Sequence, residues 1–261
     1  MKDCSVPNCK AKEKLSMNIG LIGYGRMGKM VEQVATGKGH SIQAIFDINQ
    51  PLESDSKTKN IDLFIDFSMA GSVPRNLQIA AARKIPIVEG TTGWQDQIHL
   101  LEEIKDLTCI FSPNFSIGVY VFNQIAAVAS ELIGAAGGYD VFLHEWHHSG
   151  KADSPSGTAH KLANTLLQHF TGKDKVMTET SHQKIDDNVL HVTSTRAGHV
   201  PGTHLIGFDG EYDSLKLEHC ARSRAGFVYG AVEAAEWILN RTGIYTMDDF
   251  MQDYLNLKKQ D

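Results

Sequence analysis

Residues 23–28 read Gly23-Tyr24-Gly25-Arg26-Met27-Gly28, which matches the pattern G-x-G-x-x-G. This segment separates an apolar, strand-like run at residues 18–22 from a helical pattern at residues 26–36. In that context Gly23 permits a tight turn, Gly25 lets backbone amides approach a pyrophosphate, and Gly28 permits close packing of helix on strand. The pyrophosphate then lies at the positive end of the helix. The segment therefore predicts a dinucleotide site lined by these six residues, with a glycine-rich turn that binds nothing as the alternative.

A carboxylate in the right place supports the dinucleotide interpretation. Asp47 follows Gly28 by 19 residues and ends a second strand-like run at residues 41–46, where it can accept hydrogen bonds from ribose hydroxyls. A 2′-phosphate would meet like charge there, and the next residue, Ile48, offers no cation. We therefore expect NADH to be favoured over NADPH, although the nearby Arg26 and Lys29 could offset this preference.

The N-terminal half alternates strand-like and helical patterns, which is typical of a Rossmann-like, doubly wound parallel sheet in an α/β protein. The strand-like runs are residues 18–22, 41–46, 63–65, 86–88 and 109–111, and the helical patterns are 26–36, 73–84 and 94–105. Two loops follow strand carboxyl ends, where such sheets bind ligands. These loops add seven residues to the candidate cofactor site: Gly90, Thr91, Thr92, Ser112, Pro113, Asn114 and Phe115.

The remaining chain has a different pattern, which predicts a second, α+β domain with a mixed sheet. Helical patterns at residues 119–133 and 158–170 flank a strand at 139–148, and β-like runs follow at 189–196, 200–208 and 214–220. The last two runs are expected to join at Asp209-Gly210. A further helix at residues 226–240 fits either domain.

The composition limits the kinds of partner that the protein is expected to bind. The formal net charge of −6 over 261 residues would repel nucleic acid and anionic lipid, so neither is expected as a partner. The uncharged run at residues 107–130 carries Pro113 and several polar residues, so it is not expected to cross a membrane. Residues 1–16 are expected to be a disordered leader without a secretion signal, which favours a reducing cytoplasm and free thiols. Cys109 and Cys220 are expected to be small buried side chains.

Residues 144–158 hold the densest chemistry. His144, Glu145 and His148 match H-E-x-x-H, a zinc-hydrolase motif that requires a helix to bring both imidazoles to one metal. The preceding residues are strand-like, and a strand turns His144 and His148 to one face and Glu145 to the other. We therefore expect no metal and keep the zinc hydrolase as the weakest alternative.

Acid-base chemistry with anion capture is the stronger interpretation. The amides of Gly157 and Thr158, with the hydroxyls of Ser156 and Thr158, precede a helix and would form a carboxylate or phosphate site. His148 and Lys151 could add hydrogen-bonding or cationic groups to that site. Either His147 or Lys151 could deliver a proton. The alternative is a simple helix cap beside a solvated lysine.

Together these residues resemble the dihydrodipicolinate reductase family, also described as 4-hydroxy-tetrahydrodipicolinate reductase, of lysine and diaminopimelate biosynthesis. The resemblance spans residue 17 to the C-terminus. It rests on Gly25-Arg26-Met27-Gly28, Asp66-Phe67-Ser68, Gly90-Thr91-Thr92-Gly93, Asn114-Phe115-Ser116-Ile117-Gly118-Val119, His147-His148 with Lys151, Asp153-Ser154-Pro155-Ser156-Gly157-Thr158-Ala159, and Ser223-Arg224.

The resemblance implies reduction of a cyclic imine dicarboxylate with NADH or NADPH, with the candidate cofactor residues lining the nucleotide site. By resemblance His147 and Lys151 match proton donors, and His148, Gly157 and Thr158 match substrate contacts. It implies a cofactor domain of residues 17–117 plus 226–261, a substrate domain of residues 118–225, and a homotetramer built by the second sheet. The family often has a longer glycine turn and a base after the Asp47 position, which Ile48 lacks. A nucleotide-sensing protein without catalysis is the remaining alternative.

Overall fold

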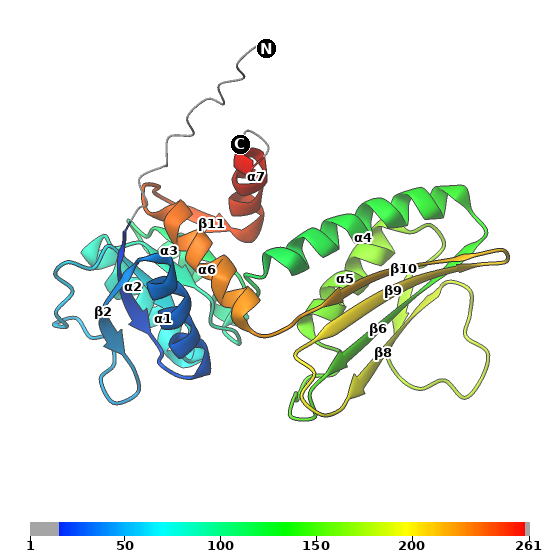
Figure 1. Cartoon of the computed structure of the whole chain (residues 1–261), viewed down its shortest axis with the longest axis horizontal. Coiled ribbons are helices and arrows are strands. Elements are labelled where there is room, and N and C mark those ends of the chain that lie inside the picture. The colour runs from blue at the N-terminus through cyan, green and yellow to red at the C-terminus, as the bar shows by residue number, and fades with distance from the viewer. Residues whose placement is uncertain (1–15, 259–261) are drawn as a thin grey trace, which may run out of the picture. The chain divides into compact units, whose positions relative to one another are not determined.

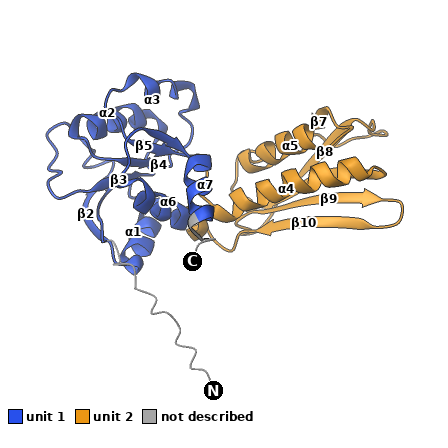
Figure 2. Ribbon diagram, turned by 90° about the horizontal axis from the view of Figure 1, so that it is seen from above, with its two compact units in different colours: residues 1–113, 228–261 blue, residues 114–227 orange. Residues whose placement is uncertain are grey.

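The computed structural model describes residues 16–258, which form two compact units. Within that range, unit 1 comprises residues 16–113 and 228–258, and unit 2 comprises residues 114–227 (Figure 2). The predicted leader, with Cys4 and Cys9, lies outside the described residues except for Ser16.

Unit 1 is built on a six-stranded, fully parallel sheet, which confirms the predicted doubly wound fold (Figure 1). Its order β11-β5-β4-β3-β1-β2 uses β1 (Asn18–Ile22), β2 (Ser41–Phe46), β3 (Leu63–Asp66), β4 (Ile87–Glu89), β5 (Cys109–Phe111) and β11 (Ile244–Thr246). The helices are α1 (Arg26–Lys38), α2 (Val73–Arg83), α3 (Leu100–Glu103), α6 (Ala225–Ile238) and α7 (Met247–Lys258). Figure 2 shows α2 and α3 on one face of the sheet and α1 and α6 on the other.

The helix predicted at residues 226–240 is α6, and it packs beside α1. The Lys38 ammonium at the end of α1 forms ion pairs with Glu233 and Glu236 of α6. Val228 and Ala231 of α6 are fully buried. The C-terminal segment thus returns to the sheet that begins the chain.

Unit 2 is a mixed sheet with two helices, as predicted, and it has five strands where four were expected. Its order β10-β9-β6-β8-β7 uses β6 (Tyr139–His147), β7 (Lys175–Met177), β8 (Val189–Arg196), β9 (Thr203–Gly210) and β10 (Ser214–Cys220). The helices α4 (Ile117–Ala136) and α5 (Gly157–His169) pack together and cover one face (Figure 1). The core beneath them includes Phe122, Leu143, Leu162 and Phe208. The central strand β6 therefore has one covered face and one face that no described helix covers.

Among the described helices, α4 alone is long and apolar enough to span a membrane. It nevertheless contributes Phe122 and Ala126 to the core of unit 2. The uncharged run at residues 107–130 is therefore divided between β5, a loop and the first part of α4.

Several local predictions were wrong. Residues 94–105 form a 3₁₀ turn and the four-residue α3 rather than one helix, because the buried Trp94 donates its indole N–H to the Thr91 carbonyl and ties the segment to the preceding loop. Asp209-Gly210 ends β9, and the turn lies at residues 211–213. Cys220 is exposed, because it faces away from the helices that cover Leu217, whereas Cys109 is buried as predicted. Three elements, β7, β11 and α7, were not predicted.

Candidate active site

The glycine turn of unit 1 has the geometry that a pyrophosphate requires. Gly23 has φ +85°, and a Cβ there would lie 2.4 Å from the carbonyl oxygen of Phe67. A Cβ on Gly28 would lie 2.1 Å from the Gly23 carbonyl oxygen, so both positions require glycine. Gly25 instead faces open space and leaves the N-terminus of α1 without a side-chain cap. Uncapped amides at a helix start suit an anion.

The other residues of the turn flank this helix end. The Tyr24 hydroxyl donates to the Glu32 carboxylate, and the Lys29 ammonium lies 5.8 Å from the centre of the Tyr24 ring. Arg26 is exposed and Met27 is half-buried. Two cations therefore stand near the place predicted for the phosphates.

Phe67 connects the glycine turn to the Gly90 loop, a role that the sequence analysis did not assign. Its carbonyl crowds Gly23, and its ring lies 2.3 Å from where a Cβ on Gly90 would stand. Thr91 is buried and its hydroxyl accepts from the Ser68 amide, whereas Thr92 is exposed. The carboxyl ends of β1, β3 and β4 thus bring these predicted residues to one edge of the sheet.

The same edge holds two buried carboxyl groups to which sequence reasoning assigned no role. Asp66 and Glu89 end the adjacent strands β3 and β4 and are 0% and 1% exposed. Burial raises the pKa of both, and the charge of Asp66 raises that of Glu89 further. Glu89 accepts from the Thr91 amide at 2.7 Å, and Asp66 accepts from Asn76 at 2.7 Å. Their adjacency follows from strand pairing and has no local sequence signal.

Asp47 directly follows β2 and is half-buried. One of its carboxylate oxygens accepts from the amides of Asn49, at 2.8 Å, and Gln50, at 3.0 Å. These contacts fix the carboxylate at the strand end. Ile48 beside it is 79% exposed.

The second predicted cofactor loop is divided between the units. Ser112 and Pro113 belong to unit 1, and the Ser112 amide donates to the Glu89 carbonyl. Asn114 and Phe115 belong to unit 2. Asn114 donates to the Thr158 hydroxyl at 3.4 Å, so it lies beside a predicted substrate residue, while Phe115 is buried.

The segment 144–147 lies on strand β6, so the zinc-hydrolase alternative is wrong. His144 packs on Trp146 and hydrogen bonds to Thr193 on the face without helices. Glu145 is fully buried on the helix-covered face. The strand alternation therefore separates the motif's histidines from its glutamate.

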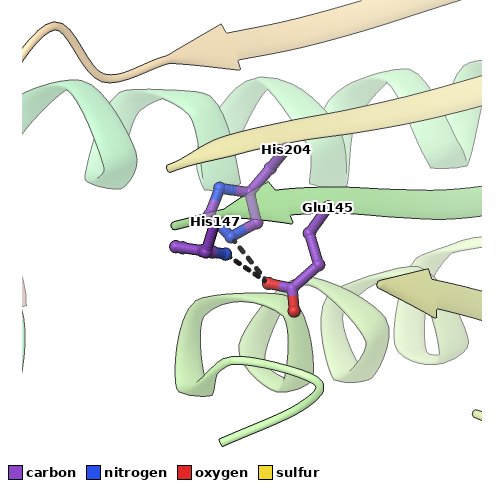
Figure 3. Close-up of side chains that lie close together, drawn as sticks. All are labelled: Glu145, His147 and His204. Atoms are coloured by element: carbon purple, nitrogen blue, oxygen red, sulfur yellow. Dashed lines mark ion pairs between the residues drawn. The ribbon is translucent and has the colours of Figure 1, made fainter. Parts of the chain in front are cut away.

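Glu145 is the centre of a buried polar cluster. One oxygen, Oε1, accepts from the Ser156 amide at 2.9 Å and from Ser194 and Arg196 at 2.8 Å each. The other oxygen, Oε2, accepts from the Ser156 hydroxyl and lies 3.3 Å from His147 Nδ1 and 3.4 Å from His204 Nε2 (Figure 3). Burial raises the Glu145 pKa, but the hydrogen bonds from His204, Ser156, Arg196 and Ser194 outweigh it and hold the pKa well below its usual range.

The cluster keeps His147 neutral near pH 7. Burial lowers its pKa to about 4, the charge of Glu145 counteracts the shift, and His204, Lys151 and Arg196 lower the pKa further. The adjacent His148 is half-buried, and its Nε2 lies 3.3 Å from an Arg224 nitrogen. Sequence reasoning did not assign a role to Arg196, Ser194 or His204.

The N-terminus of α5 follows this cluster. Ser156 is the N-cap, accepts from the Ala159 amide and is only 2% exposed, so its hydroxyl and amide are engaged with the helix and Glu145. Gly157 is exposed and Thr158 half-buried. Lys151 Nζ lies 2.7 Å from the Asp153 carboxylate. Burial raises the pKa of Asp153, but the hydrogen bond and the charge of Lys151 outweigh it and lower that pKa overall.

Glu145, His147 and His204 also lie within metal-ligating distance of one another. The cation of Arg196 already neutralises the carboxylate, and Ser156 hydrogen bonds to both Glu145 and His204. A metal ion would have to displace these contacts and approach Arg196. We therefore treat Glu145 as a carboxylate paired with Arg196, with the imidazoles of His147 and His204 packed against its second oxygen.

Comparisons with known proteins cover nearly the whole chain. Residues 17–115 match the family model "Dihydrodipicolinate reductase, N-terminus", and residues 118–251 match "Dihydrodipicolinate reductase, C-terminus". A 4-hydroxy-tetrahydrodipicolinate reductase of Christiangramia forsetii is 36% identical over 91% of this chain and 98% of its own. One from Archaeoglobus fulgidus is 35% identical over 87% of this chain and 96% of its own.

A solved structure shares the fold. A dipicolinate-bound dihydrodipicolinate reductase from Paenisporosarcina sp. TG-14 superposes with a TM-score of 0.66 at 20% identity. The similarity covers 89% of this chain and 98% of that one.

Proposed function

The chain belongs to the dihydrodipicolinate reductase family, and we propose from its geometry which residues carry the reaction. It is an NAD(P)H-dependent oxidoreductase that reduces 4-hydroxy-tetrahydrodipicolinate, by way of dihydrodipicolinate, to tetrahydrodipicolinate in lysine and diaminopimelate biosynthesis. One observation carries the site assignment. Lys151 pairs with Asp153 just before α5, and His147 lies 3.3 Å from Glu145, which accepts from the amide of the α5 N-cap Ser156.

Unit 1 holds the dinucleotide, which supplies a hydride when bound. Gly23, Gly25 and Gly28 make the turn that accepts the pyrophosphate, with Gly90, Thr91 and Thr92 on the adjoining loop. The carboxylate of Asp47 accepts hydrogen bonds from the ribose hydroxyls. It favours NADH over NADPH, because a 2′-phosphate would meet its negative charge and Ile48 offers no cation. Separate titrations with NADH and NADPH test this preference, and tighter binding of NADPH would refute it.

The substrate is a doubly anionic ring, and one of its carboxylates binds at the N-terminus of α5. The amides of Gly157 and Thr158 and the Lys151 ammonium receive this carboxylate in place of Asp153, with His148 beside them. Ser156 supports the site as the N-cap of α5, where its hydroxyl accepts from the Ala159 amide. The ion pair of Lys151 with Asp153 supports this proposal, because it already puts a carboxylate on the ammonium just before the start of α5.

Reduction of the conjugated imine builds negative charge, which an acid must neutralise. Lys151, charged in its ion pair with Asp153, can supply a proton directly. His147 has a pKa of about 4, so it can act only after the substrate's negative charge has raised that pKa. Both residues are therefore assigned to proton delivery.

An assay of NADH oxidation with enzymatically generated substrate tests these roles. His147→Ala and Lys151→Ala should each lose about 10²-fold or more in kcat. In the wild type, kcat/KM should fall as pH rises above about 4 if His147 must be protonated, while kcat should persist to higher pH. Full turnover by both variants would remove the proton-delivery assignment.

We also propose a cytoplasmic homotetramer, with no nucleic acid or membrane partner. The uncovered face of the unit 2 sheet carries Phe142, which is 39% exposed, and the half-buried Trp146. Aromatic residues on an uncovered sheet face suit contact with another subunit. Light scattering of the wild type and of Phe142→Asp tests the assembly, and a monomeric wild type would refute it.

A further inference from the structure

Glu145 occupies a position that the proposed reaction leaves without a role. It lies on the central strand β6, with Ser194 of β8 and His204 of β9 directly opposite it. All three side chains meet on the helix-covered face, and Glu145 is 0% exposed. A carboxylate at this depth is expensive unless it is paired and hydrogen-bonded. Such an arrangement calls for a functional explanation.

The two oxygens of this carboxylate face different parts of the site. Oε1 receives Arg196, Ser194 and the amide of Ser156, so it is fixed to β8 and to the start of α5. Oε2 receives the Ser156 hydroxyl and faces the imidazoles of His147 and His204 (Figure 3). Three fixed donors leave the carboxylate little freedom to rotate. The helix end is therefore held by a fixed carboxylate, and Oε2 of this carboxylate lies 3.3 Å from Nδ1 of His147.

We propose that Glu145 is a positioning residue, which with one buried carboxylate fixes both the ring of His147 and the first turn of α5. The inference rests on the proposed function, because that function assigns His147 to proton delivery and the α5 N-terminus to carboxylate binding. Glu145 faces Nδ1 of His147, which leaves Nε2 as the nitrogen available to the substrate. Binding and proton delivery are thereby kept in one fixed geometry.

The charges around His147 give the inference a distinctive signature. The charged or titratable groups that face this ring are Glu145 on β6, Arg196 on β8, His204 on β9 and Lys151 in the following loop. Of these, Glu145 raises the pKa of His147 and the other three lower it. Removal of Glu145 and removal of His204 should therefore shift the titration of His147 in opposite directions.

Four variants test the inference: Glu145→Gln, Glu145→Asp, His204→Gln and, as the control, Glu218→Gln. Glu218 is an exposed residue of β10, so its variant loses the same charge without touching the cluster. Two readouts are required, namely kcat and KM with enzymatically generated substrate, and the titration of His147 by NMR of histidine-labelled protein. The NMR titration needs no turnover, so it tests the contact even if the proposed reaction fails.

Glu145→Gln should lower kcat about 10²-fold, raise KM and move the His147 titration to lower pH. His204→Gln should move that titration to higher pH, and Glu145→Asp, which keeps the charge, should retain more activity than Glu145→Gln. Glu218→Gln should match the wild type. If Glu145→Gln does not fold, two results still test the positioning role of Glu145. These are the shift of the His147 titration to higher pH in His204→Gln and the partial activity of Glu145→Asp.

The outcomes separate the two levels of inference. An unchanged His147 titration in folded Glu145→Gln, or equal activity of the Gln and Asp variants, would overturn the positioning role. A shifted titration with normal kcat and KM would support the contact but refute the assignment of His147 and α5 to the reaction.

Discussion

Gly202 lies against the ring of His147, and its replacement by alanine should impair proton delivery. A Cβ at Gly202 would lie 2.9 Å from His147 Nε2 and 3.2 Å from Cδ2. Carbon atoms in favourable contact stand about 3.5–4.0 Å apart, so the ring must move by roughly 0.6 Å or more. Misplacement by about 1 Å can cost about 10²-fold in rate. We therefore expect Gly202→Ala to lose about 10²-fold in kcat, which corresponds to about 2.7 kcal/mol.

Stability should fall as well, because Gly202 has φ +150°. Such a conformation costs an alanine about 1–3 kcal/mol, which corresponds to a fall in Tm of roughly 2–12 °C. Gly198→Ala is the matched control. Gly198 lies in the same connection between β8 and β9 and has φ +52°, but a Cβ there meets nothing within 4 Å.

The assay compares NADH oxidation and thermal unfolding for both variants. Gly198→Ala should lose stability with little change in kcat, whereas Gly202→Ala should lose both. A folded Gly202→Ala protein with wild-type kcat would refute the reasoning, because it would show that the ring of His147 can move without affecting the reaction.

Three further predictions concern other parts of the site. Lys151→Ala should lower kcat/KM by about 10²-fold or more, and Lys151→Arg should recover KM more than kcat, since arginine keeps the charge but is a poorer proton donor; steady-state kinetics check both. Asp47→Ala should weaken NADH binding by roughly tenfold, because the lost hydrogen bonds to the ribose contribute about 1.4 kcal/mol. Binding of NADPH should be unchanged or tighter, and fluorescence titrations check both. Burial and the charge of Asp66 raise the pKa of Glu89 in the folded state. Glu89 therefore makes the free energy of unfolding fall as pH rises above its unfolded pKa of about 4.3. Glu89→Gln should lessen that fall, which thermal melts between about pH 5 and pH 8 can check.

Local patterns predicted the framework of the site. The glycine turn at residues 23–28 was predictable, because Gly23 and Gly28 answer steric demands that arise from the next strand and from within the turn. The alternation along residues 139–147 likewise predicted that His144 and Glu145 would face opposite sides of a strand. Periodicity is sufficient for such statements because it concerns one element at a time.

Contacts between residues far apart in the sequence could not be predicted from these local patterns. Arg196 and His204 reach Glu145 only through the register of β6 with β8 and β9, and a one-residue slip would turn them to the other face. The adjacency of Asp66 and Glu89 similarly depends on the pairing of β3 with β4. The charges and polar groups that tune the site are therefore the part that a single sequence conceals.

Two carboxylates near the helix start illustrate why burial determines function. Asp153 is 56% exposed in its ion pair with Lys151, and an exposed pair of this kind contributes about 0–1 kcal/mol, so a substrate carboxylate can replace it at little cost. Glu145 is fully buried against Arg196, and removal of one partner of a buried pair costs about 3–5 kcal/mol. Under the proposed function, the exposed pair keeps Lys151 in place until substrate binds, and the buried pair stays intact throughout. The proposed reaction gives the two carboxylates different roles: Asp153 leaves Lys151 to the substrate carboxylate, whereas Glu145 stays beside the ring of His147.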